Sequence, residues 1–94
     1  MTLADKQWSE SCYVERDKIG MYMVISSTRQ AMNLLSRYWP VTDGEAYFQA
    51  LRVFGQVMME KLPPDSAREA FLAAAAEADV FVSNKPQLFH LPRG

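Results

Sequence analysis

Prolines limit what this 94-residue chain can fold into more than any other feature of its sequence. Pro40 follows Trp39, and Pro63 and Pro64 stand together. Proline lacks the backbone N–H that a helix interior needs, and it disfavours helical backbone in the residue before it. A helix therefore cannot run through these positions, and the helices of this chain must end or begin there.

Two helices are predicted upstream of the proline pair. An apolar stripe of helical period spans 28–38, and Ser27 with Gln30 forms a capping box, in which the Ser hydroxyl accepts from the third helical N–H while Gln reaches back to the cap. A second capping box, at 42–45, precedes a wide apolar stripe that runs to about Lys61. These patterns predict a helix at 28–38 and a second helix that follows the capping box at 42–45 and runs to about Lys61.

The third predicted helix follows Pro63 and Pro64 directly. Asp65 and Glu69 supply the negative charge that suits a helix N-terminus. The apolar positions that follow are mostly alanines around the single bulky side chain of Phe71, which allows a close approach to a neighbouring element. This helix is predicted to pack inside the domain.

The N-terminal quarter of the chain has the pattern of a β-hairpin. Aromatic and β-branched residues are frequent from Trp8 to Ile25, and a charged stretch with a glycine lies between the two arms. In the second arm, period two places Ile19, Met21, Met23 and Ile25 on one face. The segment 80–82 is either a third short strand or an apolar exit from the last helix.

We therefore expect an α+β fold in which an N-terminal antiparallel hairpin, with or without a strand near 80–82, packs against three α-helices. The chain is long enough for one domain over 1–94, with an ordered core of about 8–82 and an extended tail at 83–94.

Charge and cysteine content favour a soluble protein of the cytoplasm. Ten basic residues oppose eleven acidic ones, and the arginines are spaced singly, so nucleic acid is not an expected partner. No apolar run is long enough for a signal core or a membrane span. The single cysteine, Cys12, has no second cysteine in the chain to pair with and is expected to be a buried apolar residue.

The sequence predicts no catalytic residues, no metal and no cofactor. His90 is the only histidine, and no nucleophile, base and orienting group occur at a recognised spacing. One His and one Cys far apart do not form a metal cluster. The four glycines are too scattered for a phosphate-binding loop.

Five residues are candidates for an interaction or binding site. Trp8, Trp39 and Phe89 are large apolar surfaces near element ends or in the tail, although Trp39 is more readily interpreted as a plug of the core. Arg52 and Arg68 are candidate anchors for an anion, although an internal ion pair is the more ordinary role for Arg68.

One set of residues, in this order along the chain, is similar to the pattern of a known family: Trp39-Pro40, then Gly44, then Ala67-Arg68-Glu69-Ala70-Phe71. Over residues 8 to 80 the chain resembles the bacterial domain of unknown function 982, a family of short proteins found mainly in rhizobia and related alphaproteobacteria. The segment 55–58 departs from the family pattern, and the chain after Val82 lies outside the match. The resemblance implies a fold and a bacterial source, and it brings no activity.

The favoured hypothesis is a non-enzymatic protein-interaction or regulatory module, with a homodimer as the simplest assembly. A two-stranded sheet is marginal by itself, and its edge invites pairing with another chain. The alternative is a small-molecule or anion-binding domain, with a pocket between hairpin and helices anchored by Arg68 or Arg52. Nucleic-acid binding and an enzyme follow as weaker hypotheses.

Overall fold

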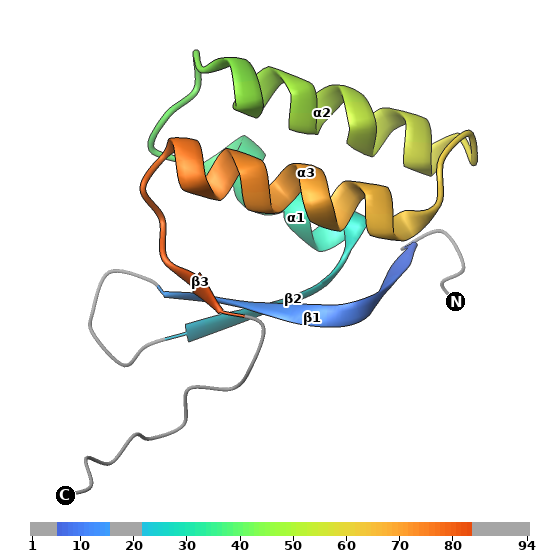
Figure 1. Cartoon of the computed structure of the whole chain (residues 1–94), viewed down its shortest axis with the longest axis horizontal. Coiled ribbons are helices and arrows are strands. Elements are labelled where there is room, and N and C mark those ends of the chain that lie inside the picture. The colour runs from blue at the N-terminus through green and yellow to red at the C-terminus, as the bar shows by residue number, and fades with distance from the viewer. Residues whose placement is uncertain (1–5, 16–21, 84–94) are drawn as a thin grey trace, which may run out of the picture.

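The computed structural model describes residues 6–15 and 22–83, which form a sheet covered by helices (Figure 1). The elements in chain order are β1 (Gln7–Glu15), β2 (Tyr22–Ser27), α1 (Thr28–Tyr38), α2 (Glu45–Met58), α3 (Pro64–Glu77) and β3 (Val82–Ser83). The α+β prediction is confirmed, including the hairpin, the three helices and a third short strand.

All three helices lie on one side of the sheet, with α2 farthest from it (Figure 1). α1 contacts β2, α3 contacts β1, and α2 packs on the other two helices. Alternation along β2 follows this arrangement, since Ile25 is buried towards the helices while Val24 is 47% exposed on the other face. Ile19 and Met21, predicted to share the face of Ile25, lie outside the described residues.

The strand order is β2-β1-β3, and both pairings are antiparallel. β1 and β2 are in regular register from Glu15 opposite Tyr22 to Cys12 opposite Ile25, and they meet again where Gln7 lies opposite Ser27. Between these points β1 carries more residues than β2, so it bulges. β3 pairs only with Tyr13 and Val14 of β1.

Phe71 stands at the centre of the core between the two tryptophans. Its ring centroid lies 5.8 Å from that of Trp8 and 5.6 Å from that of Trp39, and all three side chains are buried. Trp8 Nε1 donates to Thr28 Oγ1 at 3.1 Å, which satisfies the buried indole. Both the plug interpretation of Trp39 and the buried position of Cys12 are confirmed.

The predicted capping box at the start of α1 is present with one change. Ser27 Oγ accepts from the Gln30 N–H at 3.2 Å, as expected. Gln30 Oε1, however, accepts from the N–H of Ser26 at 2.6 Å, one residue before the cap. Because Ser26 lies in β2, this contact joins the strand to the helix that follows it.

The capping box predicted at 42–45 is wrong. The cap residue of α2 is Gly44, and no side chain of the turn caps the helix. Instead the carboxylate of Glu77, at the end of α3, accepts from the N–H groups of Ala46 at 2.9 Å and Tyr47 at 3.0 Å. A Cβ at position 44 would overlap that carboxylate, so any other residue there would displace Glu77 from its place at the helix start. The negative charge also suits the positive end of the helix dipole.

α2 ends at Met58, earlier than the predicted end at about Lys61. Glu60 takes a left-handed conformation with φ of 64°, and the N–H of Lys61 turns back to the carbonyl of Gln56 at 2.8 Å. This is a Schellman motif, which usually carries glycine at the left-handed position. The sequence has no glycine there, so no local signal marks the end of the helix at Met58.

α3 ends in the same way. Asp79 has φ of 60°, and the N–H of Val80 donates to the carbonyl of Ala75 at 2.9 Å. Val80 therefore belongs to the helix end, and the strand expected at 80–82 is shifted to Val82–Ser83. Ser83, expected in the tail, is part of the sheet.

Candidate interaction surface

The outer edge of β2 presents backbone groups that point away from the sheet. The N–H of Ser26 donates to Gln30 of α1 and therefore faces away from β1. Backbone groups alternate between the two edges of a strand, so Val24 and Tyr22 direct their N–H and C=O to the same outer side. The ladder agrees, since the Glu15 N–H donates to the carbonyl of Phe81, just before β3, and leaves the alternate residues of β1 to bond β2.

Among residues 6–15 and 22–83, nothing gives this edge the usual protection of an edge strand. Natural edge strands are commonly guarded by a charged side chain, a proline, a bulge or very short length. The six residues Tyr22–Ser27 include no charged residue and no proline, and the extra residues of the bulge lie in β1. Within the described residues, the sheet order places no strand outside β2.

A groove of about 300 Å³ runs between this edge and α1. Its lining residues come from three consecutive positions of β2 and one stripe of α1: Met23, Val24, Ile25, Gln30, Asn33, Leu34, Arg37 and Tyr38. Val24 and Tyr38 are 47% and 62% exposed, which is high for large apolar side chains. A chain laid along β2 would place its side chains on this surface.

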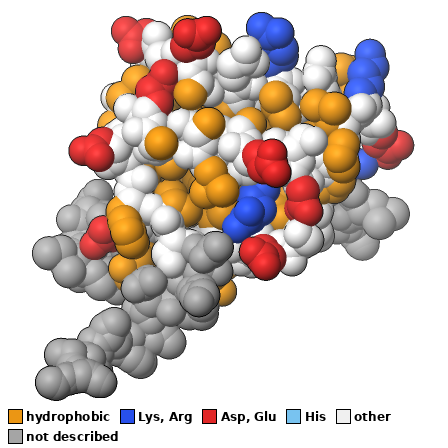
Figure 2. Space-filling view, in the orientation of Figure 1, with side chains coloured by type: hydrophobic (Ala, Val, Ile, Leu, Met, Phe, Trp, Pro, Cys, Tyr) orange, Lys and Arg blue, Asp and Glu red, His pale blue; other side chains and the backbone are white. Residues whose placement is uncertain are grey.

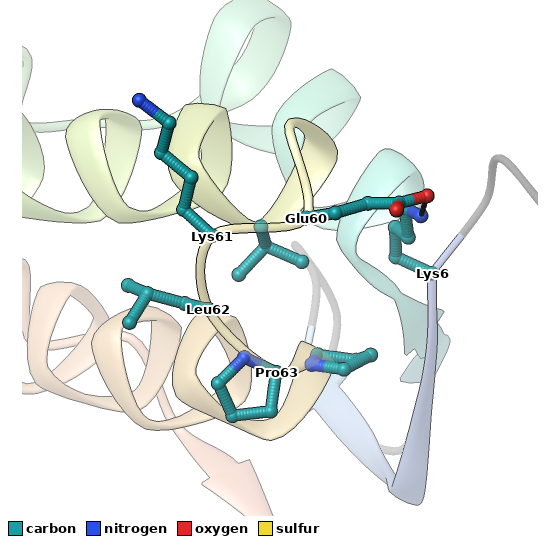
Figure 3. Close-up of a pocket in the computed structure, with 7 residues that line it drawn as sticks. Lys6, Glu60, Lys61, Leu62 and Pro63 are labelled. Atoms are coloured by element: carbon teal, nitrogen blue, oxygen red, sulfur yellow. Dashed lines mark hydrogen bonds and ion pairs between the residues drawn. The ribbon is translucent and has the colours of Figure 1, made fainter.

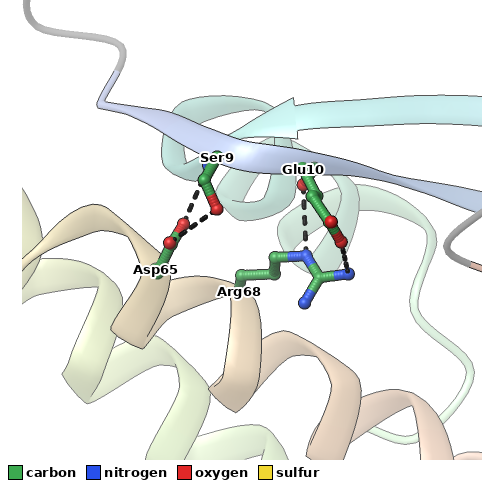
Figure 4. A network of polar contacts seen from close by, with 4 residues as sticks. All are labelled: Ser9, Glu10, Asp65 and Arg68. Carbon is green, nitrogen blue, oxygen red and sulfur yellow. Dashed lines mark hydrogen bonds and ion pairs between the residues drawn. The ribbon is translucent and has the colours of Figure 1, made fainter.

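A second stretch without strand pairing, Ser9 and Glu10 in the bulge of β1, is held by α3 (Figure 4). Asp65 accepts from Ser9 twice, from the N–H at 2.9 Å and from Oγ at 2.7 Å. Arg68 Nε donates to the Glu10 carbonyl at 3.1 Å, and a second guanidinium nitrogen lies 3.5 Å from the Glu10 carboxylate. The predicted internal ion pair of Arg68 is confirmed. Asp65 lies in the first turn of α3, as expected, and its carboxylate bonds the strand.

These contacts shift the ionisation of two groups. The hydrogen bonds from Ser9 lower the pKa of Asp65, because they stabilise the carboxylate. Burial raises the pKa of the Cys12 thiol, and the nearby Arg68 opposes this only in part. Cys12 is therefore a poor nucleophile at neutral pH.

The remaining candidates from the sequence lie apart from the β2 edge. Trp8 and Trp39 are in the core, Arg52 is exposed on α2, and Phe89 lies outside the described residues. A pocket of about 390 Å³ adjoins Arg68, but the guanidinium that would anchor an anion there already bonds Glu10. The residues missed by the sequence reasoning are Val24, Gln30 and Tyr38. The sequence feature that could have indicated them is a predicted strand without charged residues that is followed directly by a helix.

Another pocket, of about 360 Å³, lies between the turn after α2 and the start of β1 (Figure 3). Lys6 Nζ pairs with Glu60 at 3.0 Å, while the side chain of Lys61 extends away from the labelled prolyl ring of Pro63. On the face seen in Figure 2, basic side chains occur singly among hydrophobic and acidic ones. Neither view offers the clustered cations that phosphate binding needs.

A family model described as "Protein of unknown function (DUF982)" matches residues 10–82. No curated protein and no solved structure matches the chain. Within the described part of the chain, no helix has the length and apolar character needed to cross a membrane.

Proposed function

The chain belongs to the DUF982 family of proteins of unknown function, and we propose that it acts as a non-enzymatic protein-interaction module that forms a homodimer through β2. The observation that carries this proposal is the unprotected outer edge of Tyr22–Ser27 beside the groove with α1. An edge of this kind binds another extended strand by main-chain hydrogen bonds, while a neighbouring groove receives side chains. A second copy brings the same uncharged strand, so no like charges oppose each other.

The Ser26–Gln30 contact selects the register of this pairing. In an antiparallel pair related by a two-fold axis, outward-facing residues exchange backbone hydrogen bonds. The Ser26 N–H is already used by Gln30, which leaves Tyr22 and Val24 as donors. Tyr22 of each copy therefore pairs with Val24 of the other copy. Met23 lies on the two-fold axis, opposite Met23 of the other copy.

Apolar burial adds to these hydrogen bonds. Val24 and Tyr38 both line the groove, and their exposed apolar side chains lie close enough to the β2 edge to be partly covered in the dimer. Each apolar Å² removed from water contributes about 25 cal/mol. A stable dimer needs an interface above about 1,000 Å², so α1 must contribute alongside the strand.

The first test is the solution mass of the full chain across a concentration series, for the parent and for Val24→Pro. Proline at 24 removes a donor that faces outward and leaves the ladder with β1 intact, so it should yield a folded monomer. Val24→Thr is the matched control, because it keeps the N–H and the β-branched shape, and it should remain dimeric. A parent chain that stays monomeric at all concentrations would refute the proposal.

A cross-linking experiment tests the register independently. Cα atoms of a non-hydrogen-bonded antiparallel pair lie about 4.5 Å apart, within reach of a disulfide. Met23→Cys should therefore give a cross-linked dimer under mild oxidation. Glu69→Cys, on the exposed side of α3, should not. Equal cross-linking of the two variants would indicate random collision and would contradict this register.

A further inference from the structure

A separate cleft of about 550 Å³ lies at the end of the molecule where α3 leads into β3. It is framed by the end of β1, the end of α1 and the α3–β3 connection (Figure 1). The lining residues that matter for its chemistry are Glu15, Tyr38, Trp39, Asp79 and Phe81. This cleft touches the groove beside β2 only through Leu34 and Tyr38.

The cleft combines aromatic rings with negative charge. Tyr38 and Phe81 are 62% and 52% exposed, and the ring of Trp39 lies beside them in the lining. Among the described residues that line it, Glu15 and Asp79 are acidic and none is basic. Aromatic faces attract cations, and a guanidinium also stacks on them. Charge complementarity therefore favours a cationic occupant with a planar or apolar body.

Trp39 supplies a second observation. Its Nε1 donor is buried and has no hydrogen-bond acceptor among the described residues, whereas the equivalent atom of Trp8 bonds Thr28. Buried donors without acceptors are uncommon in folded proteins. A free amine brings no acceptor, but a peptide brings carbonyl oxygens together with its side chain. Because Trp39 also lines the cleft, a peptide bound there brings such carbonyls close to this residue.

We propose that this cleft binds an arginine side chain of an extended partner peptide. The guanidinium stacks on the exposed rings and lies between the carboxylates of Glu15 and Asp79, which accept its hydrogen bonds. The adjacent peptide carbonyl accepts from Trp39. This site shares Leu34 and Tyr38 with the groove beside β2, but its acidic residues lie outside that groove and it does not require the homodimer.

The test is an NMR titration of the full chain with a blocked Ala-Arg-Ala peptide, observing the two indole N–H signals. The Trp39 signal should move in a saturable manner, while the Trp8 signal serves as an internal control and stays in place. The matched control peptide carries citrulline, which has the shape of arginine without its charge, and should bind at least tenfold more weakly. Equal shifts with both peptides would overturn the proposal.

Two variants locate the cation. Asp79→Asn keeps a residue that tolerates the left-handed conformation, and Glu15→Gln keeps the size of the side chain. Each should weaken the arginine peptide by about threefold to tenfold, as expected for a partly exposed charge contact. Unchanged affinity in both would refute the site. Binding by the Val24→Pro variant should persist, so that failure of the dimer and failure of this cleft give different results.

Discussion

In the described part of the chain, two stretches of backbone in this sheet have no strand beside them, and their backbone groups are bonded differently. Ser9 and Glu10, in the bulge of β1, are bonded by Asp65 and Arg68 of α3. The outer edge of β2 has the N–H of Ser26 bonded by Gln30, while Tyr22 and Val24 face outward beside an apolar groove. The first stretch is closed by the protein's own side chains, and the second is left open.

The difference shows that the chain has the means to protect exposed strand backbone. An aspartate and an arginine one helical turn apart on α3 reach one donor and one acceptor of the bulge. Among the described side chains, no comparable pair is placed against Val24. Since unprotected edges favour aggregation unless a partner covers them, the open edge of β2 supports its assignment as an interaction surface.

The largest effect is expected from opening the closed stretch. The double variant Asp65→Ala with Arg68→Ala leaves the Ser9 N–H and the Glu10 carbonyl without side-chain partners. Each lost contact should cost about 1 kcal/mol or more, so the free energy of unfolding should fall by about 2–3 kcal/mol in urea denaturation. Arg52→Ala, an exposed arginine on α2, should change it by less than about 0.5 kcal/mol. Equal effects would show that the bulge contacts contribute nothing specific.

A smaller effect is expected from removing the one internal contact of the open edge. Gln30→Ala frees the Ser26 N–H and should lower the free energy of unfolding by about 0.5–1 kcal/mol. It also allows a register in which Val24 pairs with Val24 of the other copy. The two positions 23 then no longer face each other, so cross-linking by Met23→Cys should decrease. Gln30→Glu retains an acceptor and should keep the original register. Unaltered cross-linking in Gln30→Ala would show that this contact does not set the register.

The smallest effect concerns acid stability at the closed stretch. The pKa of Asp65 is lower in the folded chain than its ordinary value of about 3.9, because Ser9 bonds the carboxylate. Its stabilising contribution is therefore present above that ordinary value and is lost as the pH falls through the lower folded pKa. Because the group is partly exposed, the contribution should be below about 1 kcal/mol. The difference in stability between parent and Asp65→Asn should shrink on acidification, and a difference that grows would contradict this account.

Sequence reasoning predicted local features well and contacts between elements poorly. The N-cap of α1, Ser27, bonds a residue only three positions away, so the local sequence was enough to predict it. The cap of α2 depends on Glu77, far along the chain, and the local pattern at 42–45 was misleading. The ends of α2 and α3 were obscured because Glu60 and Asp79 occupy positions that usually hold glycine.

The candidate surface was predicted only in outline. The sequence indicated a hairpin with an edge available for pairing, and the structure identified β2 as the open edge. Only the structure shows that Asp65 and Arg68 bond the bulge of β1, whereas Gln30 bonds Ser26 of β2. These contacts join residues that are far apart in the chain in the first case and four residues apart in the second. The aromatic residues Trp8 and Trp39, attractive as anchors, are instead stacked about Phe71.

The sequence by itself determined the elements, since proline placement, apolar period and the Ser27 cap act over a few residues and need no tertiary contact. Only the tertiary structure decided which backbone is covered and which is open. Covering a backbone group takes a side chain that folding brings from another element. Such long-range placement decides the bulge in β1, the Glu77 cap and the open edge of β2. Local sequence patterns carry no information about it.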